Sequence, residues 1–221
     1  MWNFVAQNWQ QLGVTPDRIA LAYLLARRLA ISLSGPGIRQ LARDLGDPTG
    51  AAAIEGRVHP MQYYVMPPVE PTPLAGDVYK GQVGDQNGYW VLLTPSCDLV
   101  AGREKADWVL FARSDLLSEQ AEYQKWREGL PQPPGPIQEK LEALLRNNRQ
   151  AKGIQPDRFH FLPGALALPD MVADFQQLTI LPRSQIGSLK RLASLDSPFA
   201  EALLSRFIRY FGRFRADSAV P

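Results

Sequence analysis

Residues 76–94, GDVYKGQVGDQNGYWVLLT, constrain the fold of this chain more than any other segment. Two runs in which apolar residues alternate with other residues, 76–83 and 89–94, flank the turn GDQNG at 84–88. Alternating runs around an Asn-Gly turn are the strongest short-range signal for a β-hairpin. Further runs with a strand pattern occupy 107–113, 158–163 and 171–181. The sequence therefore predicts a hairpin inside a β-rich body.

The part of the chain before this body predicts helices and then an extended arm. Residues 1–58 form an N-terminal helical region, in which IRQLARDLG (38–46) resembles the first helix of a helix-turn-helix. The alanine-rich stretch after it carries few side chains suited to reading bases. Five prolines between residues 60 and 73 then predict a proline-rich linker over 59–75.

Two helical segments belong to the body itself, which is expected to span 76–215. Charged runs split by LPQPPGP predict a helical insertion at 116–150. The run SPFAEALLSRFIRYFGRF predicts a C-terminal helix at 197–213, capped by Ser197-Pro198. An apolar stripe on that helix is expected to pack on the body: Leu203, Phe207, Tyr210 and Phe211.

Composition excludes several classes of protein. The 221 residues include one cysteine, so an internal disulfide framework is excluded and no metal-ligand spacing occurs. No apolar run reaches the roughly 18 residues of a membrane span, and the start MWNFVAQNWQ lacks the features of a signal peptide. We therefore expect a cytoplasmic protein with no cofactor, no metal and no membrane contact.

Basic residues gather near the C-terminus although the net charge is only +2. Arg206, Arg209 and Arg213 recur at steps of three and four residues, which predicts one exposed flank of the C-terminal helix. Three arginines on one flank can bind phosphates or a carboxylate-rich partner. The alternative interpretation is a solvated helix face with no ligand.

Three segments together resemble a known family: GDVYKGQV, GYWVLLTPSCD and DWVLFARSDLL. They resemble the opening of the PemK/MazF toxin family, small SH3-like barrels that cleave RNA. VADFQQLTILPRSQI is similar to the strand and turn before that family's last helix, and the resemblance covers about half of the chain. It implies a mainly β fold with helical additions, built on a small SH3-like barrel.

The resemblance does not carry the family's chemistry across. The position of the family's catalytic arginine holds Tyr89, Trp90 replaces the proline that follows it, and only Ser114 matches the catalytic hydroxyl. A phenol lacks the permanent positive charge that stabilises a phosphate transition state. An active enzyme would need relocated groups such as Arg103 or Arg113 with Ser114, while Tyr89 and Arg103 are also candidates for ligand binding.

Cys97 raises a second question of chemistry, because it stands where a predicted strand meets a loop. If the strand at 158–163 lies beside the strand at 89–94, Cys97 and His160 can form a thiolate–imidazole arrangement with a nearby aspartate, Asp98 or Asp107. The alternative is a small buried cysteine in a turn that Ser96 and Asp98 stabilise by bonding backbone N–H groups.

These observations favour a non-catalytic binding or regulatory module, of the kind found in bacterial signalling, toxin–antitoxin or defence systems. Its partner is expected to be a protein or a nucleic acid, RNA more than DNA, and the sequence allows a homodimer. The alternatives are an endoribonuclease of the PemK/MazF type and a helix-turn-helix DNA-binding regulator.

Overall fold

The computed structural model describes Ala26, residues 58–147 and residues 157–212. The predicted N-terminal helical region, its helix-turn-helix segment and Arg213 lie outside the described residues, apart from isolated positions. The chain divides into two units between His59 and Pro60. All the elements described below belong to the second unit.

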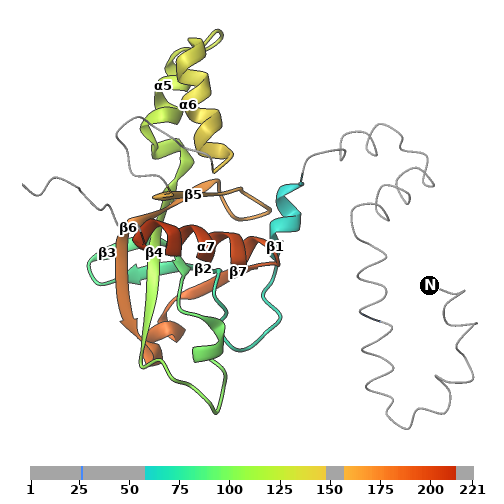
Figure 1. Cartoon of the computed structure of the whole chain (residues 1–221), viewed down its shortest axis with the longest axis vertical. Coiled ribbons are helices and arrows are strands. Elements are labelled where there is room, and N and C mark those ends of the chain that lie inside the picture. Colours follow the sequence, from blue (N-terminus) through green and yellow to red (C-terminus); the bar gives the residue numbers. More distant parts are fainter. Residues whose placement is uncertain (1–25, 27–57, 148–156, 213–221) are drawn as a thin grey trace, which may run out of the picture. The chain divides into compact units, whose positions relative to one another are not determined.

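A seven-stranded sheet, in which all pairs are antiparallel, forms the second unit (Figure 1). Its strands are β1 (Tyr64–Val65), β2 (Asp77–Val83), β3 (Gln86–Leu92), β4 (Trp108–Leu116), β5 (Phe159–Leu162), β6 (Met171–Pro182) and β7 (Lys190–Leu195). Their order in the sheet is β1-β7-β2-β3-β4-β6-β5. The mainly β class with added helices is confirmed, and the sheet is open, because β1 and β5 at its two edges do not pair with each other.

The predicted hairpin is confirmed as β2 and β3, but its turn is tighter than expected. Val83 pairs with Gln86, so Gly84 and Asp85 alone form the turn. Gly84 has a φ of 58°, the conformation that a type II′ hairpin turn requires at its first central position. Asn87 and Gly88 therefore lie in β3 rather than in the turn.

Two other strand predictions need correction. β4 extends to Leu116, so Ser114 lies inside the strand rather than after it. β7 and the two-residue β1 were not predicted, because β7 (KRLASL) was interpreted as part of the basic C-terminal region.

Three α-helices and four short 3-10 helices complete the described part of the unit. They are η1 (Pro60–Tyr63), η2 (Ser96–Asp98), η3 (Leu117–Glu119), α5 (Ala121–Glu128), α6 (Gly135–Leu145), η4 (Arg183–Ser188) and α7 (Phe199–Phe211). The helices α5 and α6 project together beyond the sheet at the top of Figure 1. Leu141 and Leu144 of α6 pack with Val172 of β6 at the base of this projection. No helix of the described residues is long and apolar enough to cross a membrane.

Successive residues of a strand point to opposite sides of the sheet, and apolar side chains are buried on both sides. One side, the helix face, packs residues such as Val91 and Ala112 against Leu203 of α7, which crosses in front of the strands in Figure 1. The other side, the loop face, packs residues such as Leu92 and Phe111 against Ile186 of η4.

The C-terminal helix differs in two details from its prediction. It begins at Phe199 without a side-chain cap, and the carbonyl of Asp196 accepts hydrogen bonds from the Phe199 and Ala200 N–H groups. Leu203, Phe207 and Tyr210 pack on the sheet as expected, whereas Phe211 is exposed. Phe211 follows Tyr210 directly, and one residue turns a helix by about 100°, so both cannot face the sheet.

Candidate functional site

Three of the predicted site residues lie on one row across the sheet. Tyr89 of β3 pairs with Ser114 of β4, Ser114 pairs with Ala173 of β6, and Ala173 pairs with His160 of β5. Tyr89 and Ala173 belong to the apolar contacts of the helix face. Because paired residues in neighbouring strands share a face, the whole row points toward the side covered by α7. We call Tyr89, Ser114 and His160 the polar row.

Two residues of the polar row that catalysis would need, Ser114 and His160, are closed to solvent. Ser114 is 2% exposed and His160 is 6% exposed. Ser114 Oγ and His160 Nδ1 have no hydrogen-bond partner among the described residues. Burial, followed by the charges of Arg206 and Arg209, lowers the pKa of His160 to about 3. The imidazole is therefore neutral at physiological pH, and its pKa is far from that of an efficient general base.

Because the Ser114 hydroxyl is buried without a partner, Ser114→Ala is expected to change the free energy of unfolding by less than about 0.5 kcal/mol or to stabilise the protein. The matched control is Thr94→Val, since Thr94 Oγ1 accepts a 2.7 Å hydrogen bond from the Leu110 N–H. Its loss leaves a backbone donor unpaired and should cost about 1–3 kcal/mol. Urea denaturation measures both changes. A cost for Ser114→Ala equal to that of Thr94→Val would show that the Ser114 hydroxyl is bonded.

Cys97 and His160 do not form the predicted thiolate–imidazole arrangement. The order β3-β4-β6-β5 places two strands between the strand before Cys97 and the strand of His160. Cys97 lies exposed in η2, with its Sγ 3.6 Å from Asp98 Oδ1. The alternative of a buried cysteine is also wrong, although Ser96 Oγ does accept a hydrogen bond, from the distant Ala75 N–H at 2.9 Å.

The predicted basic flank of α7 is largely paired. Arg206 Nη1 lies 3.2 Å from Asp157 Oδ1, and Arg209 Nε lies 3.3 Å from Asp157 Oδ2. Arg206 is largely buried, rather than on the exposed flank that its spacing predicts. Burial lowers the pKa of Arg206, and Asp157 opposes that change. The two arginines therefore connect α7 to the start of β5.

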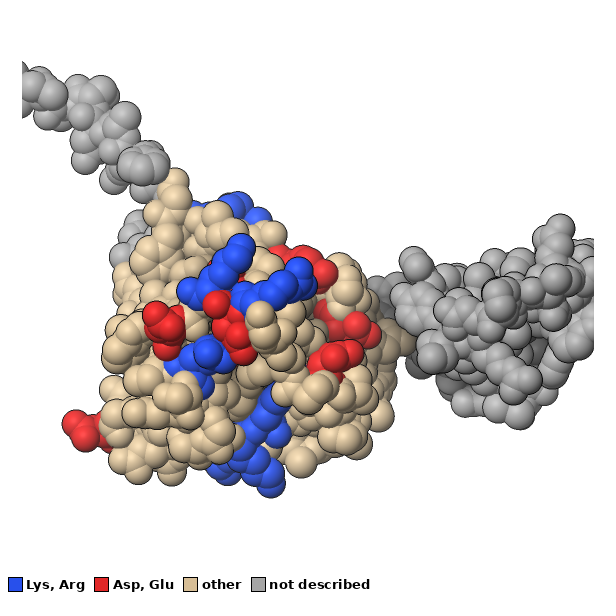
Figure 2. Space-filling model, turned by 90° about the horizontal axis from the view of Figure 1, so that it is seen from below, with Lys and Arg blue, Asp and Glu red and all other residues tan. Residues whose placement is uncertain are grey.

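Most other arginines of the described residues are paired in the same way. Ion pairs with carboxylates hold Arg113, Arg146, Arg158, Arg183 and Arg191. Figure 2 shows basic and acidic side chains next to one another on the face seen from below. Arg103, a further binding candidate, lies exposed in the loop after η2. A phosphate backbone needs several unpaired cations along one surface, and these paired arginines do not supply them.

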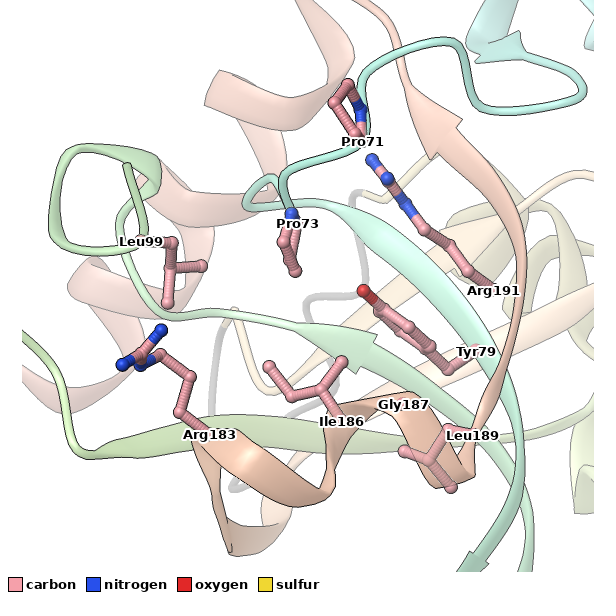
Figure 3. A pocket seen from close by; sticks show the side chains of 9 residues that line it. All are labelled: Pro71, Pro73, Tyr79, Leu99, Arg183, Ile186, Gly187, Leu189 and Arg191. Atoms are coloured by element: carbon pink, nitrogen blue, oxygen red, sulfur yellow. The ribbon is translucent and has the colours of Figure 1, made fainter. Parts of the chain in front are cut away.

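An open pocket lies on the loop face, and sequence reasoning missed it. Its volume is about 350 Å³, and Pro71, Pro73, Leu99, Ile186 and Leu189 form apolar walls. Figure 3 shows these side chains around the hydroxyl of Tyr79, which points toward the middle of the pocket. Arg183, Gly187 and Arg191 complete the lining. We call this space the Tyr79 pocket.

A buried ion pair holds the walls of the Tyr79 pocket in place. Arg191 Nε and Nη2 lie 2.7 Å and 2.9 Å from the two carboxylate oxygens of Asp77, which is 0% exposed. Arg191 Nη2 also donates to Ser194 Oγ at 3.0 Å, and Nη1 donates to the Glu70 carbonyl. The Leu74 N–H donates to Asp77 Oδ2 at 2.7 Å. These bonds fasten the proline-rich arm to β2 and β7.

The Tyr79 hydroxyl is the buried polar group of the pocket. It donates a long hydrogen bond of 3.4 Å to Asp77 Oδ2, which also accepts a 2.7 Å bond from the Leu74 N–H. Burial first, and then the charge of Asp77, raises the pKa of Tyr79. The phenol therefore stays protonated, and its one donor is directed at Asp77.

Comparisons with known proteins do not assign this arrangement to a family. No protein-family model matches the chain, and no curated protein matches its sequence.

Proposed function

We propose that the chain is a non-catalytic binding module, built on a PemK/MazF-like barrel, that contacts a protein partner through the Tyr79 pocket. The observation that carries this proposal is the opposite state of the two sheet faces. Ser114 and His160, the two candidate catalytic residues of the polar row, are buried on the helix face. The open pocket is on the loop face and has a mostly apolar lining, as ligand sites usually do.

The pairing of the arginines favours a protein partner over a nucleic acid. Seven arginines of the described residues form ion pairs with carboxylates: Arg113, Arg146, Arg158, Arg183, Arg191, Arg206 and Arg209. Nucleic-acid affinity comes largely from cations that neutralise phosphates. A cation that already neutralises a carboxylate contributes little to that affinity.

The endoribonuclease alternative has less support. Cleavage of a phosphodiester requires substrate contact with the nucleophile-positioning and charge-stabilising groups. Ser114 is sealed, and Tyr89 is partly covered by the Lys80 ammonium, which lies 5.2 Å from the centre of its ring. Neither residue offers a fixed positive charge toward a phosphate.

The full-length protein is expected to leave 5′-labelled single-stranded RNA intact and to bind it no more tightly than about 10⁻⁴ M at physiological salt, the weak end of non-specific binding. Gel electrophoresis measures cleavage of the RNA, and fluorescence anisotropy measures the affinity of the protein for it. Metal-independent cutting that is lost in Ser114→Ala would establish the ribonuclease instead. Tight binding that weakens steeply with salt would establish a nucleic-acid partner.

A further inference from the structure

We propose that the chain forms a homodimer in which the outer edge of β6 pairs, antiparallel, with the same edge of a second copy. We call residues 178–182 the β6 edge. Among the described residues, β5 pairs with β6 only from Met171 to Asp174, and no other strand lies on that side of β6. None of the residues that line the Tyr79 pocket belongs to the β6 edge, so this inference goes beyond the proposed function.

The backbone of the β6 edge directs two N–H and two C=O groups away from the sheet. The Leu110 carbonyl accepts a 2.8 Å hydrogen bond from the Leu93 N–H, so the backbone groups of Leu110 point toward β3. In antiparallel sheets, residues that bond to one neighbouring strand alternate with residues that bond to the other. Ile180 pairs with Leu110 and therefore points its N–H and C=O outward, and so does Leu178 two residues earlier. An added strand can bond to these groups.

A second copy satisfies all of these groups in one register. If Leu178 pairs with Ile180 of the second copy, every outward N–H and C=O of the two residues meets a partner across a two-fold axis at Thr179. An axis at Ile180 instead sets Leu178 opposite Pro182, which has no N–H to donate. The axis at Thr179 also places two threonines opposite each other, which is a favourable cross-strand pair.

Exposed apolar side chains flank the β6 edge on the helix face. Trp108 and Ile180 are 57% and 60% exposed. Leu110 and Leu178 pack on the helix face, and alternation along β4 and β6 places Trp108 and Ile180 on the same side. Figure 1 shows β4 and β6 running on past α7, which does not cover this end. Pairing of the two edges sets Ile180 against Leu178 of the second copy and removes apolar surface from water.

The charges around the β6 edge allow this surface to meet itself. The edge, LTILP, contains no charged residue, although natural edge strands are commonly protected from pairing by charges. At one end Arg183 is paired with Glu104. At the other end Gln177 donates to Asp115, whose charge Arg113 neutralises. The two-fold axis therefore brings no unpaired like charges together.

The proposed interface is small and closed. Five residues of strand from each copy are expected to bury less than the roughly 1,200 Å² at which stable interfaces begin, so the dissociation constant should be about 100 µM. The opposite edge of the sheet is β1, which has two residues and is followed by Pro67 and Pro68. Proline cannot donate to a ladder. Assembly therefore stops at two copies, because the β6 edges are used up in pairing with each other.

Sedimentation velocity of the full-length chain between about 1 µM and about 1 mM tests the association. We expect a monomer that becomes a dimer as the concentration rises. Ile180→Lys places a charge against the apolar side chains of the second copy and should weaken the dimer at least about tenfold. The matched control is Ile208→Lys on α7, where Ile208 is 66% exposed, and it should not change the association. Equal association of both variants would overturn the proposal.

A cysteine at the two-fold axis tests the register. Thr179→Cys is combined with Cys97→Ser, because Cys97 is the chain's only cysteine. Directly opposite residues that do not bond to each other have Cα atoms about 4.5 Å apart, which a disulfide can span. Mild oxidation should give a covalent dimer on a non-reducing gel, whereas Ile208→Cys in the same background should stay monomeric. Equal cross-linking of the two variants would overturn the register.

Hydrogen exchange of the backbone amides distinguishes a second copy from other occupants of the β6 edge. The amides of Leu178 and Ile180 should exchange quickly at about 1 µM and gain protection at about 1 mM. Protection in the monomer would show that the chain covers its own edge. A monomer with fast exchange at both concentrations would leave the edge to a strand of another protein. Either result would overturn the homodimer, and neither bears on binding at the Tyr79 pocket.

Discussion

Asp77→Ala is expected to lower the free energy of unfolding by about 3–5 kcal/mol, the typical cost of removing one partner of a buried ion pair. Asp77 is 0% exposed and the side chain of Arg191 is 16% exposed, so water cannot replace the carboxylate. The variant also leaves the Leu74 N–H without its acceptor. The buried charge and the unpaired donor add to the loss. Chemical denaturation with urea gives the measurement.

The control for this variant is an ion pair that water reaches. Glu142→Ala removes the partner of Arg146 on α6, where the side chains are 45% and 75% exposed. Exposed pairs contribute about 0–1 kcal/mol, so Glu142→Ala should stay within that range. A third variant, Asp77→Ala with Arg191→Met, removes both charges and should recover part of the stability. A loss below about 1 kcal/mol for Asp77→Ala would show that the pair does not hold the arm.

The hairpin could be predicted from sequence because its signal is local. Alternation over β2 and β3 is visible within a few residues of the turn, and no distant contact is needed to establish it. The turn was predicted a few residues too far along the chain, because residues 84–88 contain two possible turn dipeptides, Gly84-Asp85 and Asn87-Gly88. Only the pairing of Val83 with Gln86 decides between them.

β7 could not be recognised because its sequence mixes two signals. Lys190 and Arg191 begin the strand, and both belong to a stretch that is rich in basic residues. The strand character comes from its place between β1 and β2, where Ala193 and Leu195 join the helix face. Such burial is a property of tertiary contacts, which override local propensity.

The sites show the same division between local and distant information. Tyr89, Ser114 and His160 were identified one by one, but only the order of the strands places them on one row. Whether that row is open depends on packing against the helix face, which composition does not reveal. The Tyr79 pocket was missed because its walls come from the proline arm, β2 and η4, and because its ion pair joins Asp77 to a residue 114 positions away.

Leu203→Ala is expected to destabilise the protein by about 2–5 kcal/mol, the range for removing a buried leucine from a packed core. Leu203 is fully buried and lies in the middle of α7, among the residues of the helix face. The variant removes apolar contact and leaves a cavity that the rigid sheet cannot close.

Ile208→Ala is the matched control for Leu203→Ala on the same helix, because Ile208 is 66% exposed. It should change the free energy of unfolding by less than about 0.5 kcal/mol. Alanine also favours the helix slightly more than isoleucine, so any loss of stability from Ile208→Ala must come from lost contacts rather than from lost helicity. Thermal or urea denaturation compares the two variants under one condition. Equal losses of unfolding free energy in the two variants would mean that α7 does not pack on the sheet through Leu203. The burial of the helix face could then not be explained by the packing of α7.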